Sequence, residues 1–98
     1  MVIEHARMVI KEELVEEFLQ TINRASSILI NANGYISHEL LKNKENQTLF
    51  ILVVHWSSLE DHVEGFVKSN NFLKWESMLN RYFSSVPEVL HFTEIKCD

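Results

Sequence analysis

The 98-residue sequence has little of several residue types, and each scarcity excludes a class of protein. Its one cysteine, Cys97, has no partner for an internal disulfide, as expected of a cytoplasmic protein. Its two glycines, Gly34 and Gly65, cannot build the glycine-rich loop that cradles nucleotide phosphates. Positive charge is also scarce: 9 Lys and Arg residues against 14 Asp and Glu residues give a net charge of −5. Because binding to a phosphate backbone needs a basic surface, we expect no nucleic-acid partner.

Long apolar runs are missing as well. The longest one falls far short of the roughly 20 residues that a transmembrane helix needs. The N-terminal sequence lacks the basic segment and the small-residue cleavage site of a signal peptide. We therefore expect a cytoplasmic protein with no membrane partner. The length suits one domain spanning residues 1–98, and an apolar fraction of 46% with a charged fraction of 23% is that of an ordinary globular protein.

What the sequence does have is a strongly apolar middle. Residues 49–56 read LFILVVHW, which is typical of a strand buried on both faces. Ser57 and Glu60 follow with the spacing of a capping box, which predicts the start of a helix. A helical apolar pattern then runs from residue 58 to about residue 84. We expect a break in it at residues 69–71, because Ser and Asn favour helix caps over helix interiors.

The rest of the chain supplies further strands and a first helix. Apolar residues recur at intervals of three and four after residue 11, and Gly34 suits the left-handed conformation that ends such a segment. In chain order, the elements outside the second helical region are a strand at 2–10, a helix at 11–29, strands at 35–41 and 48–56, and a last strand at 88–96. This β-α-β-β-α-β order predicts an α+β, ferredoxin-like fold with a four-stranded antiparallel sheet.

The sheet of such a fold has helices on one face only. Yet the strand at 48–56 is apolar on both faces, with Leu49, Ile51 and Val53 on one and Phe50, Leu52 and Val54 on the other. Whichever set faces away from the helices forms an apolar surface that something must cover. Apolar surfaces of that size mark interfaces, and closed twofold dimers are the commonest oligomers. We therefore expect the partner of the chain to be a second copy of itself, in a homodimer whose two sheets meet to form an α/β barrel.

A set of residues in the second half of the chain points to a family. These residues are the apolar strand ending in Trp56, then Leu59-Glu60-Asp61-His62, Phe66, Ser69, Phe72 and Trp75, and later Glu88-Val89-Leu90-His91-Phe92. With them the sequence resembles the antibiotic biosynthesis monooxygenase (ABM) family of dimeric α/β-barrel proteins. The likeness of topology covers nearly the whole chain, whereas the likeness of residues is confined to about positions 49–95.

The resemblance implies a pocket in each subunit between the helices and the sheet. Some members of the family oxidise aromatic polyketides or quinols with molecular oxygen and without metal or flavin, so the resemblance implies a monooxygenase that needs no cofactor. Other members degrade haem or process small signalling metabolites, and the fold alone does not choose among these activities. The haem-degrading relatives carry an Asn on the first strand and a Trp and an axial His on the second helical region. This sequence has His5-Ala6-Arg7 on its first strand and Phe66 and Glu76 at or near the helical positions, so the axial ligand is missing and haem degradation is disfavoured.

Two histidines are the candidate catalytic residues. His62 lies on the edge of the apolar stripe, so its imidazole can point toward the sheet, and its near-neutral pKa suits proton abstraction from a phenol. His91 lies on the last strand and faces either the helices or the dimer interface; paired with His62 it would form a polar centre in an apolar cage. The alternatives are a surface histidine for His62 and a buried, hydrogen-bonded histidine for His91. None of the five histidines has the H-x-H or H-x-x-x-H spacing of metal ligands, so we expect no metal site.

Five aromatic residues are candidates for the walls of a substrate site. Trp56, Phe66, Trp75, Phe92 and Tyr35 could stack on a flat substrate, although each could equally serve as core packing. The sequence thus predicts a cofactor-independent monooxygenase acting on a small aromatic or quinol-like molecule. The alternative is a non-catalytic dimeric barrel that binds a small hydrophobic metabolite. An enzyme should keep a cavity of about 300 Å³ or more lined by His62, whereas in the alternative the protein's own side chains would fill that space.

Overall fold

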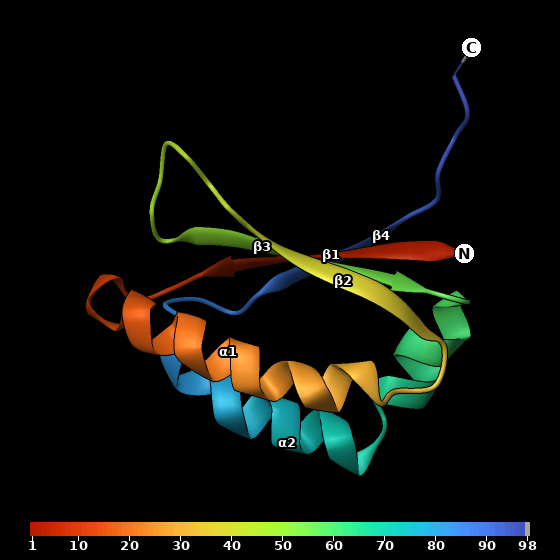
Figure 1. The fold of residues 1–98 in the computed structure, drawn as a ribbon, viewed down its shortest axis with the longest axis horizontal. Coiled ribbons are helices and arrows are strands. Elements are labelled where there is room, and N and C mark those ends of the chain that lie inside the picture. Colours follow the sequence, from red (N-terminus) through yellow and green to blue (C-terminus); the bar gives the residue numbers. More distant parts are fainter. Residues whose placement is uncertain (98) are drawn as a thin grey trace.

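The computed structural model describes residues 1–97 and has two layers, a sheet and a set of helices on one of its faces (Figure 1). The strands are β1 (Val2–Val9), β2 (Tyr35–Lys42), β3 (Leu49–Trp56) and β4 (Glu88–Phe92). The α-helices are α1 (Val15–Ile30) and α2 (Asn70–Leu79). The short helices are η1 (Glu12–Leu14), the π-helical η2 (Asp61–Phe66) and η3 (Asn80–Tyr82). This arrangement confirms the predicted ferredoxin-like α+β fold.

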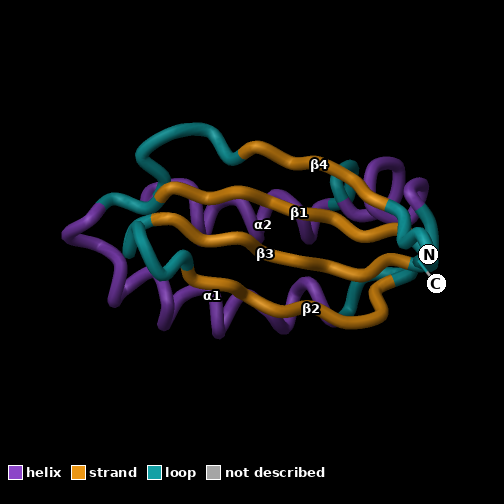
Figure 2. Tube along the Cα trace, turned by 90° about the horizontal axis from the view of Figure 1, so that it is seen from above, coloured by secondary structure: helices purple, strands orange, loops and turns teal. Residues whose placement is uncertain are grey.

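The sheet is antiparallel throughout, with the order β2-β3-β1-β4, and Figure 2 shows α1 and α2 behind the strands and running roughly along them. In the central strand β1, Glu4 pairs with Val54 of β3 and with His91 of β4. Side chains of a strand alternate between faces. Glu4 therefore points to the helical face, as do the buried Ala6 and Met8, and His91 points the same way.

The core lies between this face of the sheet and the helices. Its largest fully buried side chains come from both layers: Ile10, Phe18, Leu29, Phe50, Val54, Trp56, Leu79 and Tyr82. The polar residues buried with them are few, namely Glu4, Thr21 and His62. Because buried polar groups are costly unless they are paired, Glu4 and His62 stand out as residues that the packing alone does not explain.

The other face of the sheet carries no helix of the described chain (Figure 1). It carries exposed apolar side chains, because Ile51 is only half-buried and Leu90 and Phe92 are 50% and 45% exposed. The same face also carries the polar residues His5, Arg7, Glu39 and Glu88. No helix in residues 1–97 has the length and apolarity to cross a membrane.

Four local predictions can be compared with the structure. The break at residues 69–71 is confirmed, because Ser69 is the N-cap of α2 and accepts a hydrogen bond from the backbone N–H of Phe72 at 3.2 Å. The capping box of Ser57 and Glu60 is wrong. The neighbouring Ser58 instead accepts from the backbone N–H of Asp61 at 3.1 Å.

The last strand is shorter than predicted. It ends at Phe92 rather than residue 96, because Phe92 already pairs with Ile3, near the start of β1, and little of that strand remains to pair with the residues beyond. Gly34 has φ +82°, which confirms the expected left-handed turn.

Candidate functional site

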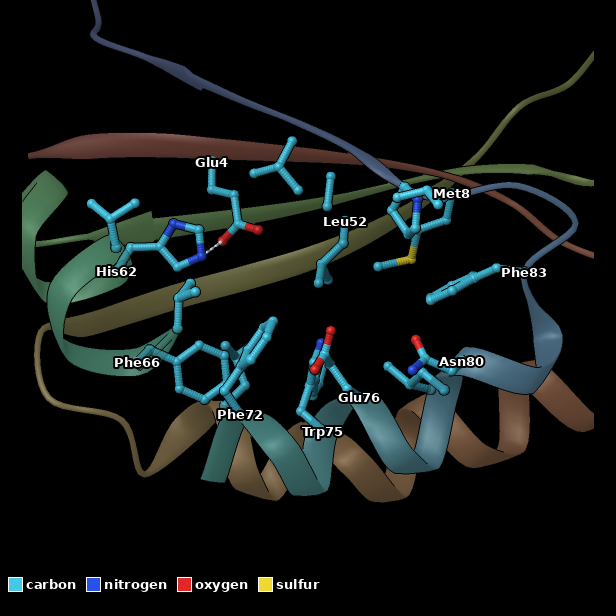
Figure 3. Close-up of a pocket in the computed structure, with 18 of the residues that line it drawn as sticks. Glu4, Met8, Leu52, His62, Phe66, Phe72, Trp75, Glu76, Asn80 and Phe83 are labelled. Carbon is cyan, nitrogen blue, oxygen red and sulfur yellow. Dashed lines mark ion pairs between the residues drawn. The ribbon is translucent and has the colours of Figure 1, made fainter. Parts of the chain in front are cut away.

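A cavity of about 390 Å³ lies between the sheet and α2 (Figure 3). Glu4, Ala6 and Met8 of β1 form part of its sheet side. Phe66, Phe72, Trp75, Leu79 and Phe83 supply much of the rest of its wall. Its volume falls in the range of about 300–1,000 Å³ typical of small-molecule sites, so the interior is not filled by the protein's own side chains.

The π-helix η2 carries His62 to this cavity. It follows β3 closely, and its wide turn is closed by a hydrogen bond from the N–H of Val67 to the carbonyl of His62 at 2.9 Å. Single π-turns are often found at functional sites. As predicted from its place in the apolar stripe, His62 points toward the sheet, and it is only 5% exposed.

His62 belongs to a connected array of four polar side chains. Trp56 Nε1 donates a hydrogen bond to Glu4 Oε1 at 2.9 Å, and His62 Nε2 lies 3.3 Å from the same oxygen. On the other side of the ring, His62 Nδ1 lies 2.8 Å from His91 Nε2. The Trp56 indole stacks on the His62 ring, with 5.0 Å between centroids and 18° between planes. The array thus joins β1, β3, β4 and η2 at one end of the cavity.

Burial sets the protonation of this array. Desolvation raises the pKa of Glu4 to about 7, and the hydrogen bond from Trp56 partly offsets the rise. Desolvation, together with the nearby His91, lowers the pKa of His62 to about 4. At neutral pH His62 is therefore uncharged, while Glu4 exchanges between its acid and its carboxylate.

One assignment of hydrogens satisfies every contact in the array. Trp56 N–H can only donate, so Glu4 Oε1 accepts. A neutral His62 with its hydrogen on Nε2 then faces Oε1, and its Nδ1 accepts from Nε2–H of His91. Glu4 Oε2 has no hydrogen-bond partner within residues 1–97, and it points into the cavity (Figure 3). A carboxyl group in this position can exchange a proton with a bound molecule.

The structure brings four of the seven predicted site residues to the cavity: His62, His91, Phe66 and Trp75. It places Trp56, Tyr35 and Phe92 elsewhere, so these three do not form its walls. Trp56 is fully buried beneath His62 and acts on the site through its hydrogen bond to Glu4 and its stacking on His62, without lining the cavity. Tyr35 bonds through its hydroxyl to His38 Nδ1 at 2.6 Å, on β2. Phe92 is on the outer face of the sheet, 4.8 Å from His5 between ring centroids, because it is one residue out of phase with His91.

Three polar residues of the cavity were missed in the sequence: Glu4, Glu76 and Asn80. The sequence does contain a hint for Glu4. Residues two apart in a strand face the same side, so Glu4 lies on the same face as the apolar Ala6 and Met8 and is a charged residue at a core position. Glu76 follows Trp75 directly on α2, where helical spacing left its direction undecided. Within residues 1–97, no group of three or more His, Cys, Asp or Glu side chains has a geometry that could hold a metal ion.

Comparison with known proteins gives the family. The model of the antibiotic biosynthesis monooxygenase (ABM) family matches residues 1–77. The chain belongs to this family. A relative of similar length is the uncharacterized protein YczJ of Bacillus subtilis (strain 168), which is 39% identical over 95 residues that cover 97% of this chain and 100% of YczJ.

Solved structures show the same fold at lower identity. A Bordetella bronchiseptica protein provisionally named an antibiotic biosynthesis monooxygenase superimposes with a TM-score of 0.93 and 22% identity, covering 97% of each chain. SnoaB, a cofactor-independent oxygenase from Streptomyces nogalater, superimposes with a TM-score of 0.84 and 18% identity, covering 98% of this chain and 94% of SnoaB. Since identities this low establish the fold alone, the chemistry of this ABM protein has to be argued from its own cavity.

Proposed function

We propose that this ABM protein is a cofactor-independent monooxygenase that acts on a small phenolic or quinol-like aromatic molecule bound in the cavity. The observation that carries the proposal is Glu4, a buried carboxyl group with a pKa of about 7 that faces an aromatic-walled cavity. General bases work best when their pKa lies near the operating pH. A protein that only stored an apolar metabolite would gain nothing from a buried carboxyl in the wall, where desolvation is costly.

The proposed reaction begins with proton transfer from the phenol hydroxyl to Glu4. The phenolate is electron-rich, and it reduces dioxygen as a bond forms between one oxygen atom and a ring carbon that bears hydrogen. Glu4 returns its proton to the resulting peroxide. Loss of the ring hydrogen as a proton and of hydroxide, together one water, leaves a carbonyl at that carbon. The balance is phenol plus dioxygen to quinone plus water, with both electron pairs supplied by the substrate.

The other members of the array support Glu4 in this scheme. With a pKa of about 4, His62 is a weak base at neutral pH, so we assign it the role of hydrogen-bond partner to Glu4 Oε1. Trp56 of β3 donates a hydrogen bond to the same oxygen, which leaves Glu4 Oε2 for the substrate. His91 lines the cavity and is less buried than His62; by donating its Nε2–H to His62 Nδ1 it holds the His62 ring in the orientation that faces Glu4.

Oxygen uptake by the purified protein with 1-naphthol, in the presence of a chelator, tests the proposal. We expect 1,4-naphthoquinone as the product, with one oxygen atom from labelled dioxygen. Glu4→Gln should lower kcat by about 100-fold or more, the usual contribution of a general base. Glu45→Gln, in the exposed loop between β2 and β3, removes the same charge far from the cavity and should leave kcat unchanged.

Two results would contradict these assignments. If Glu4→Gln turned over 1-naphthol at the wild-type rate, Glu4 would not be the base. If His62→Ala had no effect on turnover, His62 would have no part in the site.

We also propose that the protein is a homodimer formed through the outer face of the sheet. Leu90, Phe92 and Leu41 are each about half exposed on that face, and Ile51 and Val53 lie beside Leu41 on β3. His5 and Arg7 of β1 lie between these residues and β4. Apolar surface of this kind is typical of interfaces. The cavity lies on the opposite face, so the dimer would leave it accessible.

A further inference from the structure

The proposed reaction leaves two polar residues of the cavity without a role. Glu76 and Asn80 are four residues apart on α2 and η3, so they occupy one face of the helical segment about one turn apart. Figure 3 shows both reaching into the cavity, with Asn80 near Met8 and Phe83 at the end away from His62. Neither side chain has a hydrogen-bond or ion-pair partner among residues 1–97.

The two ends of the cavity differ in depth. Glu4 and His62, at one end, are 7% and 5% exposed. At the other end the lining includes Asn80, which is exposed, and Val86, which is 90% exposed, so the cavity reaches the surface there. A bound aromatic molecule would therefore have its reacting ring at the deep end and its far ring beside Glu76 and Asn80.

The ionisable side chains that line the cavity include carboxyl groups but no Lys or Arg among its described residues. The two carboxyl groups belong to Glu4 and Glu76. A negatively charged ligand would have no cation to pair with and would be repelled by Glu76 in a partly desolvated space. A hydroxyl group on the far ring could instead donate a hydrogen bond to Glu76, and Asn80 could both donate to it and accept from it.

We propose that Glu76 and Asn80 form a specificity subsite that selects uncharged aromatic molecules with a second hydroxyl group and excludes carboxylated ones. The proposal rests on the proposed function for the position of the reacting ring. Two observations carry it: the side chains of Glu76 and Asn80 have no partner among residues 1–97, and the described lining contains no Lys or Arg.

Anaerobic calorimetric titration of three naphthalene probes tests the subsite without requiring turnover. The probes are 1-naphthol, 1,5-dihydroxynaphthalene and 5-hydroxy-1-naphthoic acid. In the wild type we expect the diol to bind about tenfold more tightly than 1-naphthol, as a hydrogen bond to a charged acceptor would give. The naphthoic acid should bind at least about tenfold more weakly than 1-naphthol because of the Glu76 carboxylate.

Glu76→Gln keeps the size of the side chain and removes its charge. It should reduce the preference for the diol to about threefold and improve binding of the naphthoic acid by about tenfold. Glu76→Ala is a second variant that suits a helix, and it should reduce the preference for the diol further than Glu76→Gln does, leaving only what Asn80 provides. Glu45→Gln is the matched control and should change none of the three affinities.

The outcomes separate this proposal from the proposed function. If 1-naphthol and the diol bind equally, or if Glu76→Gln leaves the affinity of the naphthoic acid unchanged, the subsite is overturned while the aromatic site stands. If no probe binds the wild type, the aromatic site itself is contradicted, and the subsite with it.

Discussion

Glu4 occupies a position in β1 whose neighbours on the same face, Ala6 and Met8, are apolar and buried. An ionised carboxyl there loses most of its hydration, and the N–H groups of Trp56 and His62 at one of its oxygens replace only part of it. The result is a carboxyl group that still holds its proton in part at neutral pH. An exposed glutamate is fully ionised under these conditions and is a weaker base.

The raised pKa of Glu4 makes a prediction about stability. Its pKa is about 7 in the folded protein against an ordinary value of 4.5, so the folded state binds the proton more tightly. The resulting stabilisation is fully present below pH 4.5 and is lost as the pH rises through 7. Glu4→Gln lacks this dependence. Relative to that variant, the wild type should lose about 3 kcal/mol of unfolding free energy between acidic and neutral pH.

Urea unfolding of both proteins at a series of pH values measures this difference. His62 has the opposite shift, but it is present in both proteins, so the comparison isolates Glu4. A difference in unfolding free energy that stays constant with pH would show that the pKa of Glu4 is not raised.

At the scale of single residues, the sequence indicated part of the site. The apolar stripe showed that His62 could face the sheet, and the pairing of His62 with His91 was expected as a polar centre. Glu4 was missed because one glutamate in a loosely alternating strand reads as a solvent-facing residue. Only the register with β3 and β4 places it beside Trp56 and His91.

At the scale of elements, η2 is the segment after β3 that brings His62 and Phe66 to the cavity. The apolar spacing of Leu59, just before η2, and of Val63 and Phe66 within it fits an α-helix as well as a π-helix, so the sequence could not distinguish the two. Gly34, in the turn that precedes β2, fixes the start of this segment. Gly34 accepts a hydrogen bond from the N–H of Ser57 at 2.7 Å, and it packs against Asp61, the first residue of η2.

Gly34→Ala tests this contact. A Cβ at position 34 would overlap the Asp61 side chain, and the residue would have to keep φ +82°. We expect a loss of about 1–3 kcal/mol in unfolding free energy, measured by urea titration. Gly65→Ala is the matched control inside η2, where a Cβ meets only the Glu60 carbonyl oxygen at 3.8 Å, and it should stabilise the protein by about 0.5–1 kcal/mol. Equal effects of the two substitutions would contradict the role given to Gly34.

At the scale of the whole molecule, the order of elements predicted the topology, because the β-α-β-β-α-β order with short connections leaves few alternatives. The end of β4 could not be predicted, because it depends on where its partner β1 begins. The molecule measures 39 × 38 × 19 Å, and its helices cover one face of the sheet and leave the other face uncovered.

The dimer proposal can be tested on that open face. Leu90→Arg places a charge in the middle of the apolar surface of β4 and should convert a dimer of twice 11.5 kDa into a monomer. Leu73→Arg is the control, because Leu73 is 61% exposed on α2, outside the sheet, and should leave the dimer intact. Sedimentation equilibrium distinguishes these masses. A wild-type protein that is monomeric at all concentrations would refute the dimer.

The most direct test of the central claim, that Glu4 is the base of an oxygenase site, is the pH dependence of kcat/KM for oxygen uptake with 1-naphthol. Because only the carboxylate can accept the proton, we predict that kcat/KM rises with pH and levels off above an apparent pKa of about 7. Glu4→Gln should lack this rise. A profile that is flat across this range, or a rise that persists unchanged in Glu4→Gln, would contradict the claim.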